Sequence, residues 1–220
     1  AKTATVAVVA YARETITQYL DACLSAGLTP VSFEIEAQAM ARAVVPKDAT
    51  GAVMLIDFGK TRTGIGIVYD GVLLYTSTID IGGERLSESL RRVRSDAPES
   101  ELTRIKNTEG LQPGLSDSKT SEALIQTISI IKDEIISRMQ YWHLRGELRQ
   151  QRRISSTIIC GGSSNLKGLP EYLSEVLGVP CVRGDVWQQV FDDPNTVPPI
   201  DRWHSYGYAT AIGLGLQRAV

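Results

Sequence analysis

The chain has 220 residues, 43% of them hydrophobic, so it can bury a sizeable core as one large or two small domains. Its formal net charge is −2, with 22% charged residues, which excludes a globally basic surface that would attract nucleic acid or an anionic membrane. The apolar runs are too short to span a membrane and no signal peptide opens the chain, so a soluble cytoplasmic protein without direct membrane insertion is expected.

The first 50 residues are predicted to alternate strands and helices. The run from Thr5 to Tyr11 is β-branched and has the length of a buried strand, and Arg13 to Gly27 follows with helical spacing and a C-cap glycine. Val31 to Ile35 predicts a second strand, and Glu36 to Val45 a second helix. The opening is therefore read as β-α-β-α.

A hairpin-rich block follows. Ala52 to Asp57, Thr63 to Tyr69 and Val72 to Ile79 are apolar or alternating segments separated by glycine-containing turns. The pair Asp70-Gly71 is a strong signal for a two-residue hairpin turn. Three antiparallel strands are therefore expected here.

The middle of the chain is predicted to be helical. Gly82-Gly83 precedes a helix from Glu84 to Arg94, and the polar segment from Ser95 to Lys119 resembles an insertion, with one short helix at Glu101 to Lys106. Apolar residues then recur every three or four positions from Ser121 to Gln151, which predicts one long amphipathic helix.

The last third returns to strands and helices. Ile154 to Cys160 reads as a buried strand, Leu169 to Leu177 as a helix, Val179 to Val182 as a short strand and Trp203 to Gly215 as a closing helix. Alternating strands and helices imply a layered α/β fold.

Cysteine and histidine usage gives little chemistry. Cys23, Cys160 and Cys181 are widely spaced, form no CxxC pair and lie beside apolar residues, which indicates buried free thiols in a reducing compartment. The two histidines, His143 and His204, lie outside ligand spacing of a cysteine or of each other, so a metal site built on them is not expected.

The first segment that could carry chemistry follows the strand that ends at Asp57. Glycine and small hydroxyl residues come directly after it, namely Gly59, Thr61 and Thr63, with Lys60 between them. Such a hairpin can present backbone N–H groups and hydroxyls to a phosphate, while the carboxylate holds water on Mg²⁺. Asp and Gly also populate ordinary hairpins, so this motif alone does not decide between the two readings.

The second such segment follows the strand that ends at Cys160. Gly161 and Gly162 allow the backbone to approach a flat ligand, and Ser163 could cap the turn into the next helix, with Asn165 two residues further on. A Gly-Gly turn between strand and helix is common in α/β proteins, so a purely structural role stays open at this point.

The order of these segments resembles the second half of proteins of the actin, Hsp70 and hexokinase superfamily. Within it, the PilM family of type IV pilus assembly proteins is most similar, through the pattern D-I-G-x-x-x-T followed by G-G-x-x-L-T/S-E. The matching residues are Asp57, Gly59, Thr63, Gly82, Gly83, Leu86, Ser87 and Glu88. The segments Ala26 to Pro30 and Phe33 to Ala39 are similar to the same family.

The resemblance implies an actin-like, ribonuclease H-like α/β fold and a division into domains. Residues 1–30 would be the remnant of an inserted subdomain shared with the cell-division protein FtsA. Residues 31–50 and 203–220 would belong to the first actin-like domain, and residues 51–202 to the second, with a small insertion around 84–120. The family's first phosphate hairpin has no counterpart before Ala12, so the chain is expected to be truncated and to bind ATP weakly by itself.

The resemblance also implies a site for ATP and Mg²⁺, with Asp57 holding the metal's water and Gly162 lying against the adenosine. Glu36 would occupy the helix where some relatives place a water-orienting residue. The implied nucleotide contacts are Asp57, Gly59, Lys60, Thr61, Thr63, Gly82, Gly83, Glu84, Glu101, Lys106, Gly161, Gly162, Ser163 and Asn165. For Glu101 and Lys106, a solvated polar helix explains the sequence equally well.

The implied function is that of a cytoplasmic, actin-like scaffold, peripheral to the inner membrane, in which ATP binding controls recruitment of inner-membrane pilus proteins. The implied partner is the N-terminal cytoplasmic tail of PilN, with other pilus proteins and self-association also compatible, and hydrolysis weak or absent. Two alternatives stay open: an FtsA-like division protein, and a small-molecule kinase of the superfamily in which Glu36 would be the general base.

Overall fold

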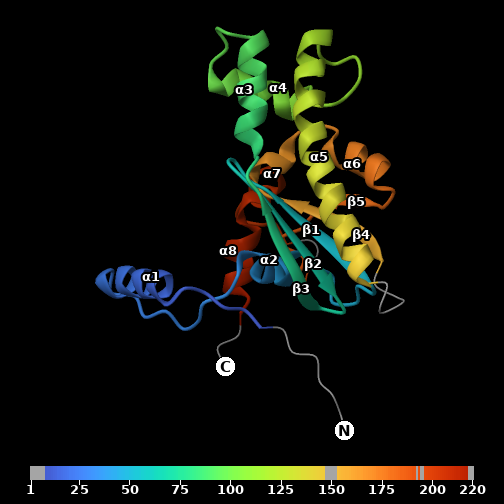
Figure 1. The fold of residues 1–220 in the computed structure, drawn as a ribbon. Coiled ribbons are helices and arrows are strands. Elements are labelled where there is room, and N and C mark those ends of the chain that lie inside the picture. Colours follow the sequence, from blue (N-terminus) through green and yellow to red (C-terminus); the bar gives the residue numbers. More distant parts are fainter. Residues whose placement is uncertain (1–7, 147–152, 192, 194–195, 218–220) are drawn as a thin grey trace.

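A five-stranded mixed sheet organises the molecule (Figure 1). The computed structural model describes residues 8–146, 153–191, 193 and 196–217. The strands are β1 (Ala52–Phe58), β2 (Thr63–Tyr69), β3 (Val72–Ile79), β4 (Ile154–Cys160) and β5 (Cys181–Arg183), in the spatial order β3-β2-β1-β4-β5. The first three form an antiparallel meander, whereas β4 runs parallel to both β1 and β5.

The hairpin signal at Asp70-Gly71 is confirmed. Asp70 has a φ of 48° and Gly71 a φ of 77°, the positive angles that a two-residue turn between twisted antiparallel strands requires. The turn sets the pairing of Tyr69 with Val72. The predicted bounds of β2, β3 and β4 agree with the structure residue by residue.

Helices cover both faces of the sheet. On one face lie α5 (Ser118–Gly146) and α6 (Leu169–Leu177), while α3 (Gly83–Val93) and α4 (Glu99–Thr108) stand beyond the ends of the strands (Figure 1). Apolar residues of these four helices form one core cluster with the alternate β1 residues Met54, Ile56 and Phe58. On the other face, α2 (Glu36–Val44) packs with Val53 and Leu55. Alternation along β1 therefore divides the core into two layers, as an α/β fold requires.

The helix α2 also contacts α8 (Ala209–Gly215), from the other end of the sequence. A Cβ at Gly213 would lie 1.8 Å from the carbonyl oxygen of Ala39, so only glycine permits this backbone approach. Arg42 donates to the Gly213 carbonyl at 2.6 Å and pairs with Glu34 at 2.6 Å. The two helices form a single layer.

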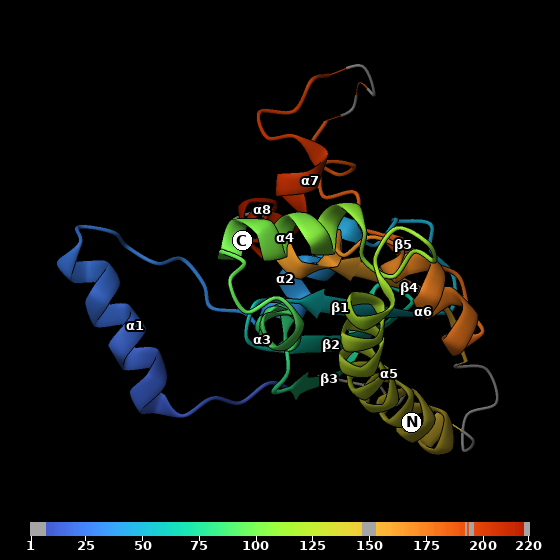
Figure 2. The ribbon, with the colours of Figure 1, turned by 90° about the horizontal axis from the view of Figure 1, so that it is seen from above.

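The helix α1 (Arg13–Ser25) stands away from the sheet in both views (Figures 1 and 2), and none of its residues is buried. Its predicted C-cap is confirmed: Gly27 has a φ of 74°, and the Leu28 N–H donates to the Cys23 carbonyl at 2.9 Å. Local sequence alone therefore defines this helix, because no tertiary packing supports it among the described residues.

Two predicted strands are wrong where the structure describes them. Val31 to Ile35 forms no strand, and neither does Val8 to Tyr11, while the rest of the predicted first strand, residues 5–7, lies outside the described residues. Their β-branched composition favours an extended chain, but a strand also needs a neighbour to pair with, and the described residues provide none.

Other bounds also differ from the sequence-based expectation. The closing helix is interrupted, with α7 (Arg202–Ser205), a 3-10 turn at Tyr206–Tyr208 and then α8. The short helix of the insertion is longer than predicted and begins at Glu99. The predicted end of the long helix, residues 147–151, lies outside the described residues, and β5 begins at Cys181 rather than at residue 179.

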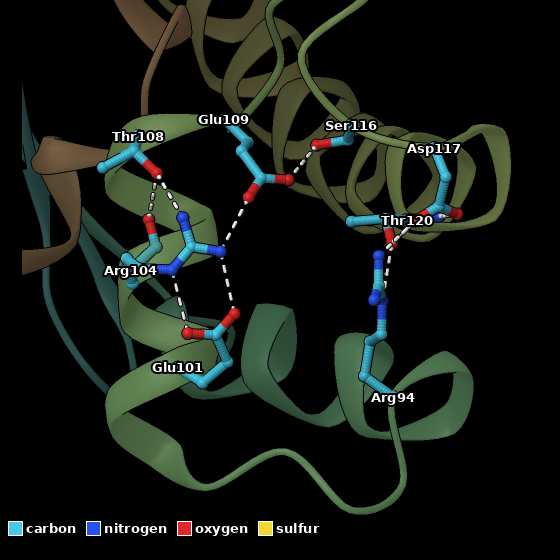
Figure 3. Close-up of polar contacts among 8 residues, drawn as sticks. All are labelled: Arg94, Glu101, Arg104, Thr108, Glu109, Ser116, Asp117 and Thr120. Carbon is cyan, nitrogen blue, oxygen red and sulfur yellow. Dashed lines mark hydrogen bonds and ion pairs between the residues drawn. The ribbon is translucent and has the colours of Figure 1, made fainter.

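Polar contacts join α3, α4 and α5 (Figure 3). Arg94, just after α3, pairs with Asp117, which precedes α5 and also accepts from Thr120. Arg104 on α4 donates to both carboxylate oxygens of Glu101 at 2.8 Å and to Glu109, the residue after α4, at 3.0 Å. Glu109 also accepts from the Ser116 hydroxyl, shortly before α5, at 2.9 Å, so these contacts link α4 and α3 to the start of α5.

The three cysteines are free. Cys160 and Cys181 are buried as predicted, and burial raises the pKa of each thiol to about 12, so neither is a reactive thiolate at neutral pH. Cys23 is only partly buried, because α1 has no packing partner among the described residues. Of the helices that the structure describes, none is both long enough and apolar enough to cross a membrane.

Candidate functional site

Three chain segments meet where β1 and β4 end. These parallel strands finish at Phe58 and Cys160 on the same edge of the sheet, which brings the two predicted loops together. The Gly59 carbonyl accepts from the Gly83 N–H at 2.9 Å and from the Ser163 hydroxyl at 3.0 Å. The β1–β2 turn, the start of α3 and the loop after β4 therefore share one acceptor.

The two glycines before and at the start of α3 are required by this contact. A Cβ at Gly82 would lie 2.5 Å from the Lys60 carbonyl oxygen, and one at Gly83 would lie 2.0 Å from the Ser163 hydroxyl. The Glu84 N–H also donates to the Lys60 carbonyl, at 2.8 Å. Gly82-Gly83 thus lets a helix start directly against the turn.

The paired glycines after β4 differ from each other. Gly161 is buried with a φ of 89°, and a Cβ there would lie 2.4 Å from the Phe58 carbonyl oxygen and 2.6 Å from Oδ1 of Asp57. Gly162 is exposed, its φ is not positive, and nothing lies within 4 Å of its ideal Cβ position. The first glycine packs against β1, and the second opens onto free space.

That space belongs to a cavity of about 350 Å³ between these loops and the helices α3 and α4. Its walls combine cationic, anionic and hydroxyl side chains with exposed glycine backbone. The lining residues are Lys60, Gly83, Glu84, Leu86, Ser87, Arg91, Glu99, Thr103, Lys106, Asn107, Gly162, Ser163 and Leu166.

Most of the predicted site residues lie in or around this cavity. Six line it: Lys60, Gly83, Glu84, Lys106, Gly162 and Ser163. Gly59, Gly82 and Gly161 form the contacts that hold the lining loops together. Asn165 lies between the lining residues Ser163 and Leu166 and donates to the Trp203 carbonyl at 2.8 Å, which fixes that loop to α7.

Four further predicted residues neither line the cavity nor make the contacts that hold its loops together. Thr63 is buried and donates to the Ile81 carbonyl at 2.7 Å, while Thr61 is exposed at the tip of the turn. Glu101 faces Arg104 instead, and this ion pair lowers the pKa of the glutamate. Glu36 is exposed and pairs with Arg62 at 3.0 Å.

Several lining residues were not predicted from the sequence. Glu99, Thr103 and Asn107 recur at helical spacing with the predicted residue Lys106 and form one face of α4, but the predicted helix began at Glu101 and left Glu99 in a loop. Arg91, on α3, was not predicted to be part of the site. The helical period of α4 was the signal that could have found this wall.

Side chains of α3 and α4 form a compact polar cluster at this wall of the cavity. Lys106 donates to the Ser87 hydroxyl at 2.7 Å, and Ser87 donates to Glu99 at 2.9 Å. Glu99 also pairs with Arg91. Burial lowers the pKa of Lys106, although the nearby carboxylate of Glu99 opposes that shift.

Asp57 is the residue that fits a magnesium role. Its carboxylate receives no hydrogen bond among the described residues, and burial, with a smaller contribution from Glu36, raises its pKa. No cluster of three or more acidic, histidine or cysteine ligands exists in the part of the chain that the structure describes. A single carboxylate matches Mg²⁺, which keeps most of its waters and takes further oxygens from phosphates.

We expect Asp57→Asn to raise the melting temperature at pH 7 in the absence of ligand. Because the folded pKa lies above the unfolded one, the folded state holds more protons between the two values, so stability falls as pH rises through that window. Above this pH window, the buried ionised carboxylate lowers the free energy of unfolding by a constant amount, and asparagine removes that loss. Melting curves from pH 3 to 8 would show the gain disappearing at low pH, and the exposed residue Asp80 gives the control Asp80→Asn.

Nucleotide affinity is a second measurement, which distinguishes a role of Asp57 in binding Mg²⁺ from a role only in shaping the β1–β2 hairpin. If Asp57 holds Mg²⁺-bound water, then Asp57→Asn in a complete protein should weaken binding of Mg-ATP more than binding of metal-free ATP. A variant that is less stable than the parent, with the same nucleotide affinity, would contradict both expectations.

Comparison with known proteins identifies the family. A family model described as type IV pilus assembly protein PilM matches residues 1–219. The cell division protein FtsA of Neisseria meningitidis serogroup B is 24% identical over 222 residues, which cover 91% of this chain and 51% of FtsA.

Two solved structures confirm the actin-like fold. The PilM–PilN type IV pilus biogenesis complex matches with a TM-score of 0.71 and 20% identity, over 93% of this chain and 57% of the matched chain. MreB5 of Spiroplasma citri bound to AMPPNP matches with a TM-score of 0.66 and 15% identity, over 93% and 64%. The chain thus spans only half to two thirds of the length of these relatives. Because the family model extends over nearly every residue, this chain belongs to the PilM family of type IV pilus assembly proteins.

Proposed function

We propose that this chain forms one side of an ATP site in an actin-like pilus assembly protein. The main support is the cavity of about 350 Å³, which is lined by the β1–β2 turn, by α3 and α4, and by the loop after β4. Six residues expected from the sequence to contact nucleotide line this cavity. The fold match to MreB5 bound to AMPPNP supports the same ligand class.

The lining residues suit the parts of a nucleotide. Lys60 on the β1–β2 turn supplies a positive charge for a phosphate, and Asp57 would hold a Mg²⁺-bound water close to that turn. Gly162 offers exposed backbone with open space above it, as a flat base requires. Lys106 and Arg91, on the opposite wall, can donate to oxygens or nitrogens of the nucleoside.

Calorimetric titration of a complete protein containing this chain tests the proposal. We expect ATP to bind in the presence of Mg²⁺, and Lys60→Ala to weaken binding about tenfold because one charge-assisted contact is lost. Thr61→Ala changes the next residue, which lies outside the cavity, and is the matched control. If the parent protein binds neither ATP nor ADP, the proposed site is wrong.

We further infer that nucleotide binding controls recruitment of PilN through its N-terminal cytoplasmic tail, on the cytoplasmic side of the inner membrane. Membership of the PilM family and the fold match to a PilM–PilN complex support this partner. Other inner-membrane pilus proteins would then be recruited through PilN.

Pull-down with a PilN tail peptide, with and without Mg-ATP, tests this inference. We expect the complete protein to retain the peptide, and ATP to change the amount retained. If the protein retains no peptide with or without Mg-ATP, the result would contradict PilN as the partner and favour an FtsA-like role. Phosphorylation of an added sugar or acid substrate would instead favour the kinase alternative.

A further inference from the structure

One buried hydroxyl group joins the two helices that form the far wall of the cavity. Ser87 on α3 is 1% exposed, yet both neighbours of its hydroxyl are charged groups of α4. Lys106 lies 2.7 Å and Glu99 2.9 Å from the Ser87 oxygen. All three residues line the cavity.

The chemistry of the three groups fixes the direction of each hydrogen bond. An ammonium group can only donate and an ionised carboxylate can only accept, so the Ser87 hydroxyl accepts from Lys106 and donates to Glu99. Both bonds involve a charged partner, which makes them stronger than bonds between neutral groups. The hydroxyl therefore has one favourable orientation, and it restrains the lysine.

Lys106 keeps donors for a ligand. Its ammonium has three N–H groups, of which Ser87 takes one. Glu99 lies 3.7 Å away, close enough for an ion pair but too far for a direct hydrogen bond. Only 15% of the Lys106 side chain is exposed, so its ammonium is held at the cavity wall and does not extend freely into solvent.

Packing of the wall itself does not depend on Ser87. The helices α3 and α4 also contact through the core, where Leu86, Leu90, Leu102 and Ile105 are each at most 2% exposed. Apolar burial on this scale outweighs the two hydrogen bonds of Ser87 in stabilising the pair of helices. The polar cluster of Ser87, Glu99 and Lys106 is therefore not needed to hold the two helices together and can contact a ligand instead.

We propose that Ser87 is a positioning residue, which holds the Lys106 ammonium where it can donate to an acceptor atom of the bound nucleotide. The proposal rests on the proposed nucleotide site. The G-G-x-x-L-T/S-E pattern contains Ser87 but does not say what its side chain does. The proposal gives that side chain a role, in addition to the contact of the start of α3 with the β1–β2 turn.

Calorimetry with Mg-ATP on the complete protein tests the proposal through three substitutions. Ser87→Ala should weaken binding about tenfold, as expected when a charged donor is no longer held in place. Ser87→Thr keeps the hydroxyl and should restore most of the affinity. Ser89→Ala removes a hydroxyl from the same helix, one that donates only to the Leu86 carbonyl, and should leave affinity unchanged.

A double-mutant cycle separates positioning from a structural role. If Ser87 acts through Lys106, then Ser87→Ala should cost nothing further once Lys106→Met has removed the ammonium. An equal loss in both backgrounds, or no loss in either, would overturn the positioning role while leaving the nucleotide site intact. Absence of Mg-ATP binding by the parent protein would overturn the site and the positioning role together. Melting temperatures of all variants, compared with the parent, verify that each one folds.

Discussion

Gly161→Ala should lower the melting temperature more than any other single change discussed for this site. The new Cβ would lie 2.4 Å from the Phe58 carbonyl oxygen and 2.6 Å from Oδ1 of Asp57, and the residue would have to keep a φ of 89°. A strained backbone costs about 1 to 3 kcal/mol, and the collision with β1 adds to it. A total of about 3 to 5 kcal/mol corresponds to a fall of roughly 10 °C for a domain of this size.

Gly162→Ala is the matched control for that experiment, because it adds the same methyl group one residue later. Its φ is not positive and its Cβ would meet no atom within 4 Å, so we expect the melting temperature to stay within about 1 °C of the parent. Differential scanning calorimetry on both variants measures the difference. Equal melting temperatures for the two variants would show that the contact between Gly161 and β1 does not matter.

In contrast to Gly161→Ala, the variant Gly162→Val should keep the parental melting temperature but lose much of its ATP affinity. The isopropyl group would extend into the cavity that Gly162 lines, where the proposed base lies. We expect about a hundredfold weaker binding in a complete protein, equivalent to about 2.8 kcal/mol. Calorimetric titration with Mg-ATP measures this loss.

Gly162→Ala again provides the comparison, because its single methyl group occupies less of the same space. An intermediate loss of affinity with alanine and a larger one with valine, both at unchanged melting temperature, would support direct contact with the ligand. If both variants keep the parental affinity, Gly162 is no part of the site. Valine resists a positive φ, but this strain would arise at Gly161 and not at Gly162, whose φ is not positive.

Sequence reasoning located the part of the site that local rules define. Asp-Gly and Gly-Gly pairs mark turns because few other residues adopt their backbone angles, and β-branched runs mark strands that have neighbours. The turn at Asp70-Gly71, the bounds of β4 and the approach of the turn at Gly59 to Ser163 were all predictable from these rules and from the resemblance.

What the sequence could not predict depends on contacts between distant residues. Whether Val31 to Ile35 forms a strand depends on a neighbouring strand, which composition does not reveal. The sequence also did not reveal that Glu36, the carboxylate proposed as a general base, pairs with Arg62 on the surface. Part of the α4 wall was missed for a local reason, because the predicted helix began at Glu101, whereas α4 begins at Glu99 directly after Pro98, where proline is tolerated.

The strand order has a consequence for how the domain assembles. The meander of β1, β2 and β3 joins residues that are neighbours in sequence, whereas β4 pairs with β1 only after the whole segment between residues 79 and 154 has been placed. Closing that long loop costs more chain entropy than closing either hairpin, and parallel pairing forms slowly for the same reason. The cavity needs both the turn after β1 and the loop after β4, so it exists only once this last, non-local closure is complete.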